Sequence, residues 1–487
     1  NRKSAARRRL GSRLKDSIRR VTAAFLVAFI AVAARLAYVG VVRAPSLSAH
    51  PRNPRVTAAR REIVRGSIFL SGGEPVARDV APGGPRLYVG PLSLAHLVGY
   101  EDARYGVAGL EASYNSELLG LDGRSWLESF VRSVFSAGHG HARGNDIVLT
   151  IDLEVQQAAE RAMAGRRGAA VALDPRTGAV LAMVSNPGFS PSQISSAWER
   201  LVEDEASPLF NRATLGLYPP GSAVKPMIAA IALSSGAVSV DETFRCEGAI
   251  RVGTRAGDDR EISCPGGKAH GNVNLSSALA YSCNVAFAQI GWRVGGEKLY
   301  NGLRSFHFGA ALPFDVPTAA GVITVADAGL DRATVAQISI GQGTLLASPL
   351  EMACAVGAIG NGGVMRRPYV VREVRDPDGA VLRRTPSVIL CVPVPAEDAG
   401  LVKDMMVGAV ARGTARAAGL PGVRVAGKTG TAQNPHGAPH AWFVGFAPAD
   451  DPRCAVAVVL ENGGSGGAVA APVAREILRA ALRAASR

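Results

Sequence analysis

The segment at residues 423–464 reads VRVAGKTGTAQNPHGAPHAWFVGFAPADDPRCAVAVVLENGG. It contains three runs of mostly small or β-branched apolar residues, at 423–433, 441–448 and 453–464. Runs of this length, bounded by Gly, Pro, Asn and Asp, predict successive β-strands. An apolar stretch at about 471–485 predicts a helix after the last strand. We therefore expect an antiparallel sheet with helices against it.

The character of the chain changes at residue 146, well upstream of these strands. IVLTID leads into a helical stretch near 153–164, and VALDPRTGAVLAMVS at 171–185 predicts two strands around a Pro/Gly turn. A chain of 487 residues with 47% hydrophobic composition can bury more than one core. We expect residues 146–487 to form one α/β domain with a central antiparallel sheet flanked by helices.

Residues 44–145 are punctuated by Gly and Pro and contain short β-like runs at 62–70 and 86–89. A more helical stretch follows at 109–119. This pattern predicts a small, irregular, β-rich module close to the membrane.

The first 42 residues predict a membrane anchor. Residues 1–20 carry nine Lys and Arg against the single Asp16, so more than half of the net charge of +14 lies in a short tail and no nucleic-acid partner is implied. Residues 21–42 are apolar except for Arg35, and as a helix they would span about 33 Å, enough to cross a bilayer. The positive-inside rule then predicts a single-pass protein with its catalytic part outside the cell membrane. A cleaved signal peptide ending near Ala31-Val32-Ala33 is the alternative, and it exports the same part.

Three short motifs carry potential chemistry. Ser222-Ala223-Val224-Lys225 places a hydroxyl and an amine on one face at the start of the predicted helix in 215–236. Ser282-Cys283-Asn284 falls in a predicted break between two helical pieces of 274–291, and Lys428-Thr429-Gly430, followed by Thr431, lies on a predicted strand.

Singly, these motifs are weak evidence. Ser12 and Lys15 repeat the first spacing in the basic tail, and Ser113-Tyr114-Asn115 repeats the second. The combination in this order is specific, because it is the motif set of active-site serine penicillin-recognising enzymes. Only seven of the 54 basic residues are lysine, and two of those seven fall in the motifs, which favours a need for a titratable amine there.

The chain also resembles a particular family over nearly everything after residue 44. LTIDLEVQQAAE, ALDPRTGAVLAMVSNP, FNRATLGLYPPGSAVK, ALAYSCNVAFAQIG, IGQGTLLASPLEMA and AGKTGTAQ are similar to blocks of class B penicillin-binding transpeptidase domains. HPRNPR, VRGSI and YGVAGLEASYNSELLG resemble the pedestal of the actinobacterial penicillin-binding protein A group, which implies that residues 44–145 form a pedestal or dimerisation domain. Ala223 and Val224 depart from the family, which usually has Thr or Ser and then an aromatic residue or Met. Leu70-Ser71-Gly72-Gly73 also stands where many members have Asp-Arg-Asn-Gly.

The resemblance implies a role for each matched residue. Ser222 would be the acylated nucleophile, Lys225 its base, and Ser282 with Lys428 the proton relay. Asn284 would bind the donor peptide amide, and Gly430 would let the substrate backbone approach. The resemblance also implies substrate contacts at Thr429 and Thr431, an oxyanion hole formed by the N–H groups of Ser222 and Thr431, and a disulfide between Cys246 and Cys264.

The activity implied is a DD-transpeptidase of peptidoglycan. The D-Ala-D-Ala end of a stem peptide would acylate Ser222 and pass to an amine on a neighbouring strand, and β-lactams would acylate the same serine. A membrane glycosyltransferase of the SEDS type is the implied partner. The sequence contains no nucleotide loop and no metal-ligand cluster, so no cofactor and no metal are expected.

Other assignments of the same motifs stay open at this stage. The same motif set also serves DD-carboxypeptidases and serine β-lactamases, in which water resolves the acyl-enzyme. A catalytically idle scaffold or a β-lactam sensor is the alternative from a different class. Among single residues, we expect Cys283 to be a small buried filler, His440 to support the site floor, and Glu111 to make a structural contact in the pedestal.

Overall fold

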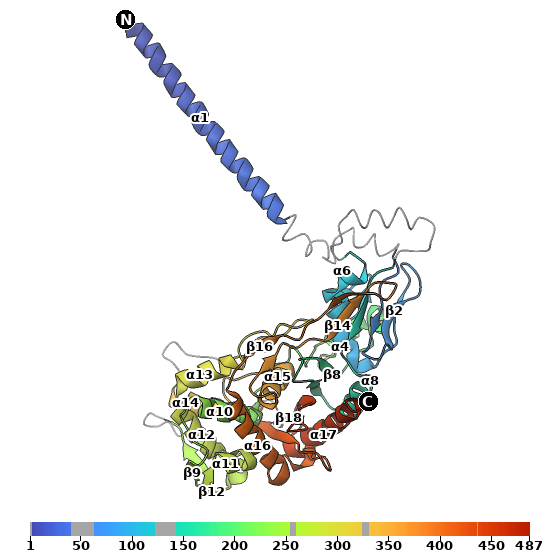
Figure 1. Ribbon diagram of the computed structural model, residues 1–487, viewed down its shortest axis with the longest axis vertical. Helices are drawn as coiled ribbons and strands as arrows, with labels where there is room; N and C mark the ends of the chain where they lie inside the picture. Colours follow the sequence, from blue (N-terminus) through green and yellow to red (C-terminus); the bar gives the residue numbers. More distant parts are fainter. Residues whose placement is uncertain (1, 40–62, 122–142, 254–259, 324–330, 436) are drawn as a thin grey trace.

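The computed structural model describes residues 2–39, 63–121, 143–253, 260–323, 331–435 and 437–487. The first described element is helix α1, Arg2–Ala37, which extends away from the rest of the molecule in Figure 1. Its part from Ser17 to Ala37 is long and apolar enough to cross a membrane, in agreement with the predicted anchor. Residues 40–42 of the predicted anchor lie outside the described residues.

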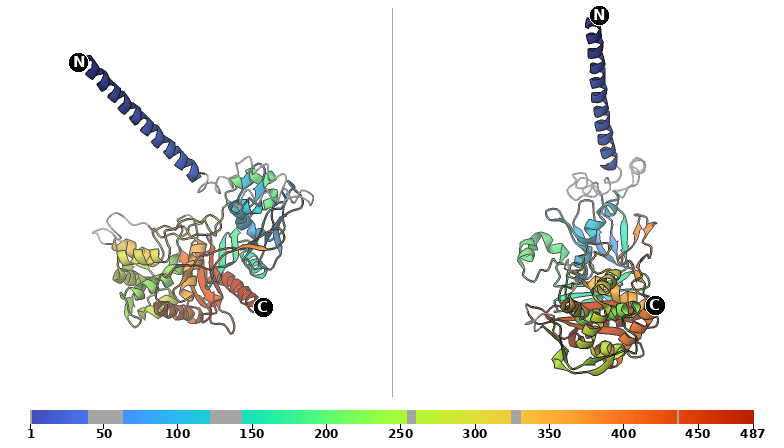
Figure 2. Two further views of the ribbon diagram at one scale, coloured as in Figure 1. Left: turned by 45° about the horizontal axis from the view of Figure 1, so that its top comes forward. Right: turned by 90° about the vertical axis from the view of Figure 1, so that its left-hand side faces the viewer.

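The membrane-proximal module is organised around a six-stranded sheet with the order β15-β14-β6-β1-β2-β3. Its strands are β1 (Ile68–Phe69), β2 (Pro75–Asp79), β3 (Arg86–Tyr88), β6 (Asp146–Leu149), β14 (Val371–Arg375) and β15 (Val381–Arg384). Strand β1 pairs in parallel with β6, and the other pairs are antiparallel. Both views in Figure 2 place the later strands beside the early ones. Half of the strands of this sheet therefore lie beyond residue 145, the residue at which the sequence analysis predicted that the pedestal ends.

Short elements complete this module. They are η2 (Leu92–Leu94), α4 (Ala95–Val98), β4 (Glu101–Asp102), β5 (Gly106–Val107), α5 (Gly109–Ser113) and α6 (Asn115–Leu118). The helical stretch expected at 109–119 is thus two single turns. Glu111 on α5 is fully buried and pairs with Arg65 and Arg86, each at 2.7 Å, so its predicted structural contact is confirmed.

The larger part of the chain contains a five-stranded antiparallel sheet with the order β17-β18-β19-β7-β8. Its strands are β7 (Gly168–Leu173), β8 (Val180–Asn186), β17 (Ala426–Ala432), β18 (His440–Ala447) and β19 (Cys454–Leu460). All five were predicted as strands from sequence. Strand β17 lies at one edge, so one of its sides is not paired with a strand of this sheet.

Side chains on the two faces of this sheet enter two different cores, as the period of two along a strand requires. On β19, Val456 and Val458 pack with helices α8 (Leu153–Met163) and α17 (Gly466–Ala484). Ala457 and Val459 belong to the larger core, which includes α15 (Pro349–Gly360). The sheet is therefore covered by helices on both faces, and β19 is buried along its whole length.

Helix α17 begins at Gly466, earlier than the 471–485 expected from sequence. A Cβ at Gly466 would lie 2.2 Å from the carbonyl oxygen of Gly430 and 2.3 Å from that of Trp442. Glycine is a poor helix former, so the sequence did not indicate a helix start at Gly466. The same glycine allows the first turn of α17 to pack directly on β17 and β18. Pro472 lies inside the helix and not at its first turn.

The remaining helices and hairpins surround the larger core. The helices are η3 (Pro191–Gln193), α9 (Ile194–Glu203), η4 (Gly221–Val224), α10 (Lys225–Ser234), η5 (Pro265–Gly267), α11 (Leu275–Tyr281), α12 (Asn284–Val294), α13 (Gly296–Ser305), α14 (Arg332–Ser339), α16 (Ala396–Arg412) and η6 (Arg416–Ala418). The short strands are β9 (Thr243–Cys246), β10 (Ala249–Arg251), β11 (Glu261–Ser263), β12 (Gly271–Asn274), β13 (Met365–Arg366) and β16 (Ile389–Cys391).

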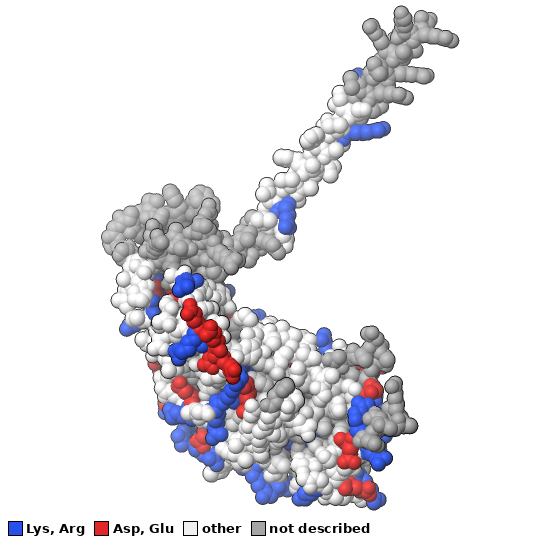
Figure 3. Space-filling view, turned by 180° about the vertical axis from the view of Figure 1, so that it is seen from behind, with Lys and Arg blue, Asp and Glu red and all other residues white. Residues whose placement is uncertain are grey.

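Charges on the face shown in Figure 3 are mixed in sign, with red and blue side chains next to one another on the membrane-proximal part. Ion pairs such as Arg384 with Glu373, at 2.9 Å, occur in the membrane-proximal sheet. The basic excess of the composition therefore forms no single-sign surface on the described part of this face.

Candidate active site

Ser222 lies in the 3₁₀ turn η4, immediately before α10. Pro226 occupies the first turn of α10, where its missing N–H costs no hydrogen bond, and an apolar run continues the helix. Gly221 has a φ of +53° and donates its N–H to the carbonyl of Gly341 at 2.8 Å. The turn holds Ser222 half-buried at the site, while Ala223 and Val224 beneath it are fully buried.

Lys225 is fully buried one turn after Ser222. Its Nζ donates to the carbonyl oxygen of Ser282 at 2.9 Å and to Oδ1 of Asn284 at 2.7 Å, and Oγ of Ser282 lies 3.4 Å away. Burial lowers the pKa of Lys225 to about 7. The amine is therefore unprotonated in a large fraction of molecules near neutral pH.

Ser282 occupies the predicted break between two helices, since it follows α11 and α12 begins at Asn284. Its φ of 59° puts it in the left-handed region, a costly conformation for a residue other than glycine. In this conformation its Oγ accepts a hydrogen bond from Nζ of Lys428 at 2.9 Å. The break thus directs Ser282 between the two lysines.

Lys428 lies on β17 and is also fully buried. Its Nζ donates to the carbonyl of Thr429 at 2.9 Å in addition to Ser282. Burial, and after it the positive charge of Lys225, holds the pKa of Lys428 well below its ordinary value. In the described part of the chain, both amines contact carbonyl, amide and hydroxyl oxygens and form no ion pair with a carboxylate, so no negative carboxylate offsets the cost of burying their protonated forms.

The edge strand β17 approaches the Ser222 turn closely. A Cβ at Gly430 would lie 2.7 Å from the carbonyl oxygen of Pro220 and 3.0 Å from the nitrogen of Ala223, so only glycine fits there. Thr431 Oγ1 accepts from the N–H of Gly466 at 3.4 Å. An open cleft of about 500 Å³ lies alongside, lined by Pro219, Gln342, Gly343 and the stretch after β17.

Thr414 is a site residue that sequence analysis missed. Its Oγ1 is 2.8 Å from Oγ1 of Thr429, so it fixes a hydroxyl of the Lys-Thr-Gly strand. Thr414 follows the C-terminal Gly413 of α16, far from the motifs in sequence, and no local pattern points to it. His440 contacts Tyr218 edge-on at 5.5 Å and accepts from the N–H of Asn462 at 3.2 Å, in keeping with a supporting role.

The motif repeats outside the site are separated from it. Asn115 of the second Ser-x-Asn is buried in the pedestal, where its Oδ1 accepts from Arg65 at 2.7 Å. Tertiary structure thus brings Ser222, Lys225, Ser282, Asn284 and Lys428 together and leaves that repeat elsewhere.

Cysteines lie directly behind this site. Sγ of Cys246 is 3.6 Å from Sγ of Cys264, which in turn is 3.7 Å from Sγ of Cys283, and all are thiols in the structure. The Cys246–Cys264 disulfide stays a prediction. His270 joins them, and the four side chains lie close enough together that the group could hold a metal ion, a grouping that sequence analysis did not find. They are spread over residues 246–283, and the β9–β12 pairing together with the α11–α12 break brings them together.

Chemically, the arrangement places Ser222 one turn before a buried amine, and it places a second hydroxyl, that of Ser282, between two buried amines that can pass protons. These are the parts needed for nucleophilic acyl transfer by serine.

Comparison with known proteins places the chain in a family. Residues 168–479 match the penicillin-binding protein transpeptidase domain, and residues 65–145 match the penicillin-binding protein A dimerisation domain. The chain is 35% identical to peptidoglycan D,D-transpeptidase PbpA of Mycolicibacterium smegmatis, over 97% of this chain and 100% of the relative.

Solved structures agree with this placement. Penicillin-binding protein A from M. tuberculosis, as its ceftriaxone acyl-enzyme complex, has a TM-score of 0.81 and 34% identity, covering 88% of this chain and 100% of the other. The D,D-transpeptidase domain of a peptidoglycan glycosyltransferase from Eggerthella lenta has a TM-score of 0.77 and 32% identity, covering 87% and 99%. The chain therefore belongs to the class B penicillin-binding proteins, the serine D,D-transpeptidases of peptidoglycan.

Proposed function

We propose that Ser222 is the nucleophile of a D-Ala-D-Ala transpeptidase and that Lys225 is its general base. Oγ of Ser222 attacks the carbonyl carbon of the penultimate D-Ala, and Lys225 takes the hydroxyl proton. The C–N bond to the terminal D-Ala breaks, and the leaving amine receives a proton through Ser282 and Lys428. The resulting ester is attacked by an amine of a neighbouring strand, which forms the cross-link and returns a proton to Ser222.

The observation that carries this assignment is the burial of both lysines around one hydroxyl. A protonated lysine cannot accept the proton of Ser222, and burial lowers the pKa of Lys225 to about 7. Nζ of Lys225 and Nζ of Lys428 both contact Oγ of Ser282, at 3.4 and 2.9 Å, which supports a proton path between the two amines.

The edge of β17 supports the proposed binding of the substrate. An extended peptide can add to an exposed sheet edge by main-chain hydrogen bonds. Asn284 would hold the donor amide, Thr429 and Thr431 the carboxylate and backbone, and Gly430 keeps the strand close to Ser222. The N–H groups of Ser222 and Thr431 would form the oxyanion hole, each such donor being worth about 3–4 kcal/mol in the transition state.

The anchor supports a single-pass protein in the cell membrane with its catalytic part outside, because the basic residues precede the apolar part of α1. This location matches the stem peptides of peptidoglycan and β-lactam antibiotics as ligands. A membrane glycosyltransferase of the SEDS type would supply the glycan strands that this enzyme cross-links.

Intact-mass spectrometry of the detergent-solubilised full chain with a penicillin tests the nucleophile. We expect one stable drug adduct on the wild type and none on Ser222→Ala. Ser234→Ala, at the C-terminal end of α10, the helix that follows the Ser222 turn, is the matched control and should be acylated like the wild type.

A second assay separates the reactions that could follow acylation. A D-Ala-D-Ala peptide incubated with and without an added amine acceptor should give mainly the cross-linked product when the acceptor is present. Hydrolysis as the main outcome in both tubes would make the protein a carboxypeptidase, and an adduct that persists in Ser222→Ala would overturn the assignment of the nucleophile.

A further inference from the structure

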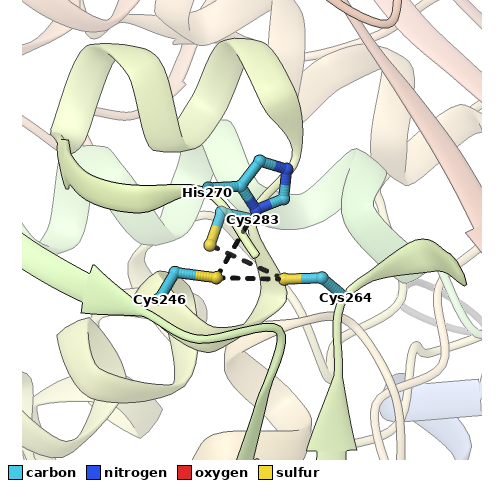
Figure 4. A group of neighbouring side chains, drawn as sticks. All are labelled: Cys246, Cys264, His270 and Cys283. Carbon is cyan, nitrogen blue, oxygen red and sulfur yellow. Dashed lines mark hydrogen bonds between the residues drawn. The ribbon is translucent and has the colours of Figure 1, made fainter. Parts of the chain in front are cut away.

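Four potential metal ligands meet behind the catalytic Ser282-Cys283-Asn284 turn. Cys246, Cys264 and Cys283 are buried and His270 is half-buried, and their ligand atoms all lie within 4.8 Å of one another. Figure 4 shows the three sulfur atoms and the His270 ring turned toward a common centre. We call these residues the cysteine–histidine cluster.

Three of the six distances between the ligand atoms match those of a tetrahedral metal site. With Zn–S bonds of about 2.3 Å, the sulfurs of a tetrahedral zinc site lie about 3.8 Å apart. The Cys246–Cys264 and Cys264–Cys283 sulfur pairs are separated by 3.6 and 3.7 Å. Nδ1 of His270 is 3.5 Å from Sγ of Cys246. In a tetrahedral zinc site with a Zn–N bond of about 2.0 Å, the nitrogen and a ligand sulfur lie about 3.6 Å apart.

Backbone N–H groups at the start of α12 point at two of the sulfur atoms. The N–H of Ala286, in the first turn of α12, donates to Sγ of Cys283 at 3.3 Å. The N–H groups of Val285 and Asn284, in the same turn, face Sγ of Cys264. The positive end of a helix thus points at two of the three sulfurs. His270 is stacked on Tyr281, with 6.0 Å between ring centres, which fixes the plane of its ring.

We propose that the cysteine–histidine cluster binds one Zn²⁺ ion as a closed Cys₃His site that braces the catalytic Ser-x-Asn turn. The three thiols release their protons on binding, and no electron is transferred. With four protein ligands no coordination position is left for water, so the role is structural. The protein thereby retains the thiols that an exported chain would otherwise lose to oxidation.

The connection to the active site is direct. Cys283 separates Ser282 from Asn284, and Nδ2 of Asn284 donates to the carbonyl of Ser263 at 2.8 Å, next to Cys264. A metal bound to Cys264 and Cys283 would therefore hold both ends of this contact. Cys246 ends β9 and His270 precedes β12, so the same ion would join that hairpin to the turn.

The predicted Cys246–Cys264 disulfide competes for the same atoms. A disulfide between any two of these cysteines leaves one thiol and the imidazole without a role, whereas a tetrahedral metal uses all four side chains. The disulfide and the metal-bound cluster are mutually exclusive, so an experiment can distinguish them.

Metal analysis of the full chain, purified from membranes in detergent without chelator, tests it. We expect about one zinc per chain, and at least a tenfold loss in Cys246→Ser and in His270→Ala, because each removes a ligand. Cys391→Ser, at a half-buried cysteine outside the cluster, is the matched control and should keep its zinc. Cobalt substitution should give the absorption bands of a tetrahedral thiolate site.

Non-reducing peptide mapping of the same samples detects disulfides, which would contradict the proposal. A disulfide joining two cluster cysteines in zinc-free wild type would overturn the proposal, as would free thiols that take up no added Zn²⁺. Zinc that stays bound in both ligand variants would overturn it as well. These readouts are independent of acylation, so they hold whether or not Ser222 proves to be the nucleophile.

Discussion

Two buried groups of basic side chains lie in different parts of the molecule, and they are neutralised in opposite ways. In the pedestal, Arg65 and Arg86 share Glu111, and Arg86 also contacts Asp79 at 3.2 Å. In the active site, Lys225 and Lys428 converge on Ser282 and contact neutral oxygens. Both groups are nearly inaccessible to solvent.

The difference follows from the chemistry of the two cations. Arginine cannot lose its proton in a protein, so buried guanidinium groups need carboxylates. Burial raises the pKa of Glu111, but Arg86 and Arg65 outweigh it, and the carboxyl stays ionised. Lysine can give up its proton, and a buried lysine without a carboxylate becomes a neutral base. One group is therefore a fixed ionic cross-link and the other a titratable pair.

The largest expected effect comes from removing the titratable amine. Lys225→Met should slow acylation by penicillin about 10²–10⁴-fold, the usual contribution of a general base. It should leave stability unchanged or improved, because it removes an amine that has no carboxylate partner. Stopped-flow acylation with a fluorescent penicillin at pH 8 and urea denaturation measure the two effects. A rate within tenfold of the wild type would refute Lys225 as the base.

A substitution in the pedestal should have the opposite pair of effects, lowering stability and leaving the acylation rate unchanged. Glu111→Gln leaves two buried guanidinium groups without their shared carboxylate and should cost about 3–5 kcal/mol of stability. The acylation rate of the folded fraction should not change. Glu247→Gln, which removes the partner of the exposed Arg245, is the control and should cost about 0–1 kcal/mol. Equal shifts of the denaturation midpoint in both variants would contradict the comparison.

The pH dependence of acylation should report only the lysine group. Because the folded pKa of Lys225 is lowered to about 7, the neutral base predominates above that pH, and the rate should rise roughly tenfold from pH 6 to pH 8. Between about pH 7 and pH 10 the unfolded lysine binds more proton than the folded one, so its contribution to stability rises with pH. A flat rate profile over this range would rule out a titrating base.

The smallest expected effect comes from a substitution that tests how closely β17, the strand of Lys428, must approach the Ser222 turn. Gly430→Ala puts a Cβ 2.7 Å from the carbonyl oxygen of Pro220 and should cost about 1–3 kcal/mol and slow acylation. Gly400→Ala in α16, where nothing lies within 4 Å, should instead stabilise the helix by about 0.5–1 kcal/mol. Opposite signs in thermal unfolding would support the close approach, and two stabilised variants would disprove it.

Periodicity predicted most of the regular elements of the catalytic part. The strands around residues 171–185 and 423–464, and the helix break at Ser282, are found where local pattern indicated. The pedestal was less predictable, because its sheet also includes β6, just past the predicted boundary, and takes β14 and β15 from a distant segment. Strand pairing of this kind depends on which edges meet in space, and no local periodicity records it.

Within the site, the sequence by itself determined the chemistry available: a serine and a lysine one helical turn apart, a second serine in a helix break, and a lysine on a strand. Only the tertiary structure decided that Lys225 and Lys428 are both fully buried beside one hydroxyl, and that Cys246, Cys264, His270 and Cys283 face one another. The physical reason is that desolvation and ligand geometry come from residues far apart in the chain, and these set the pKa of an amine and the fit of a metal.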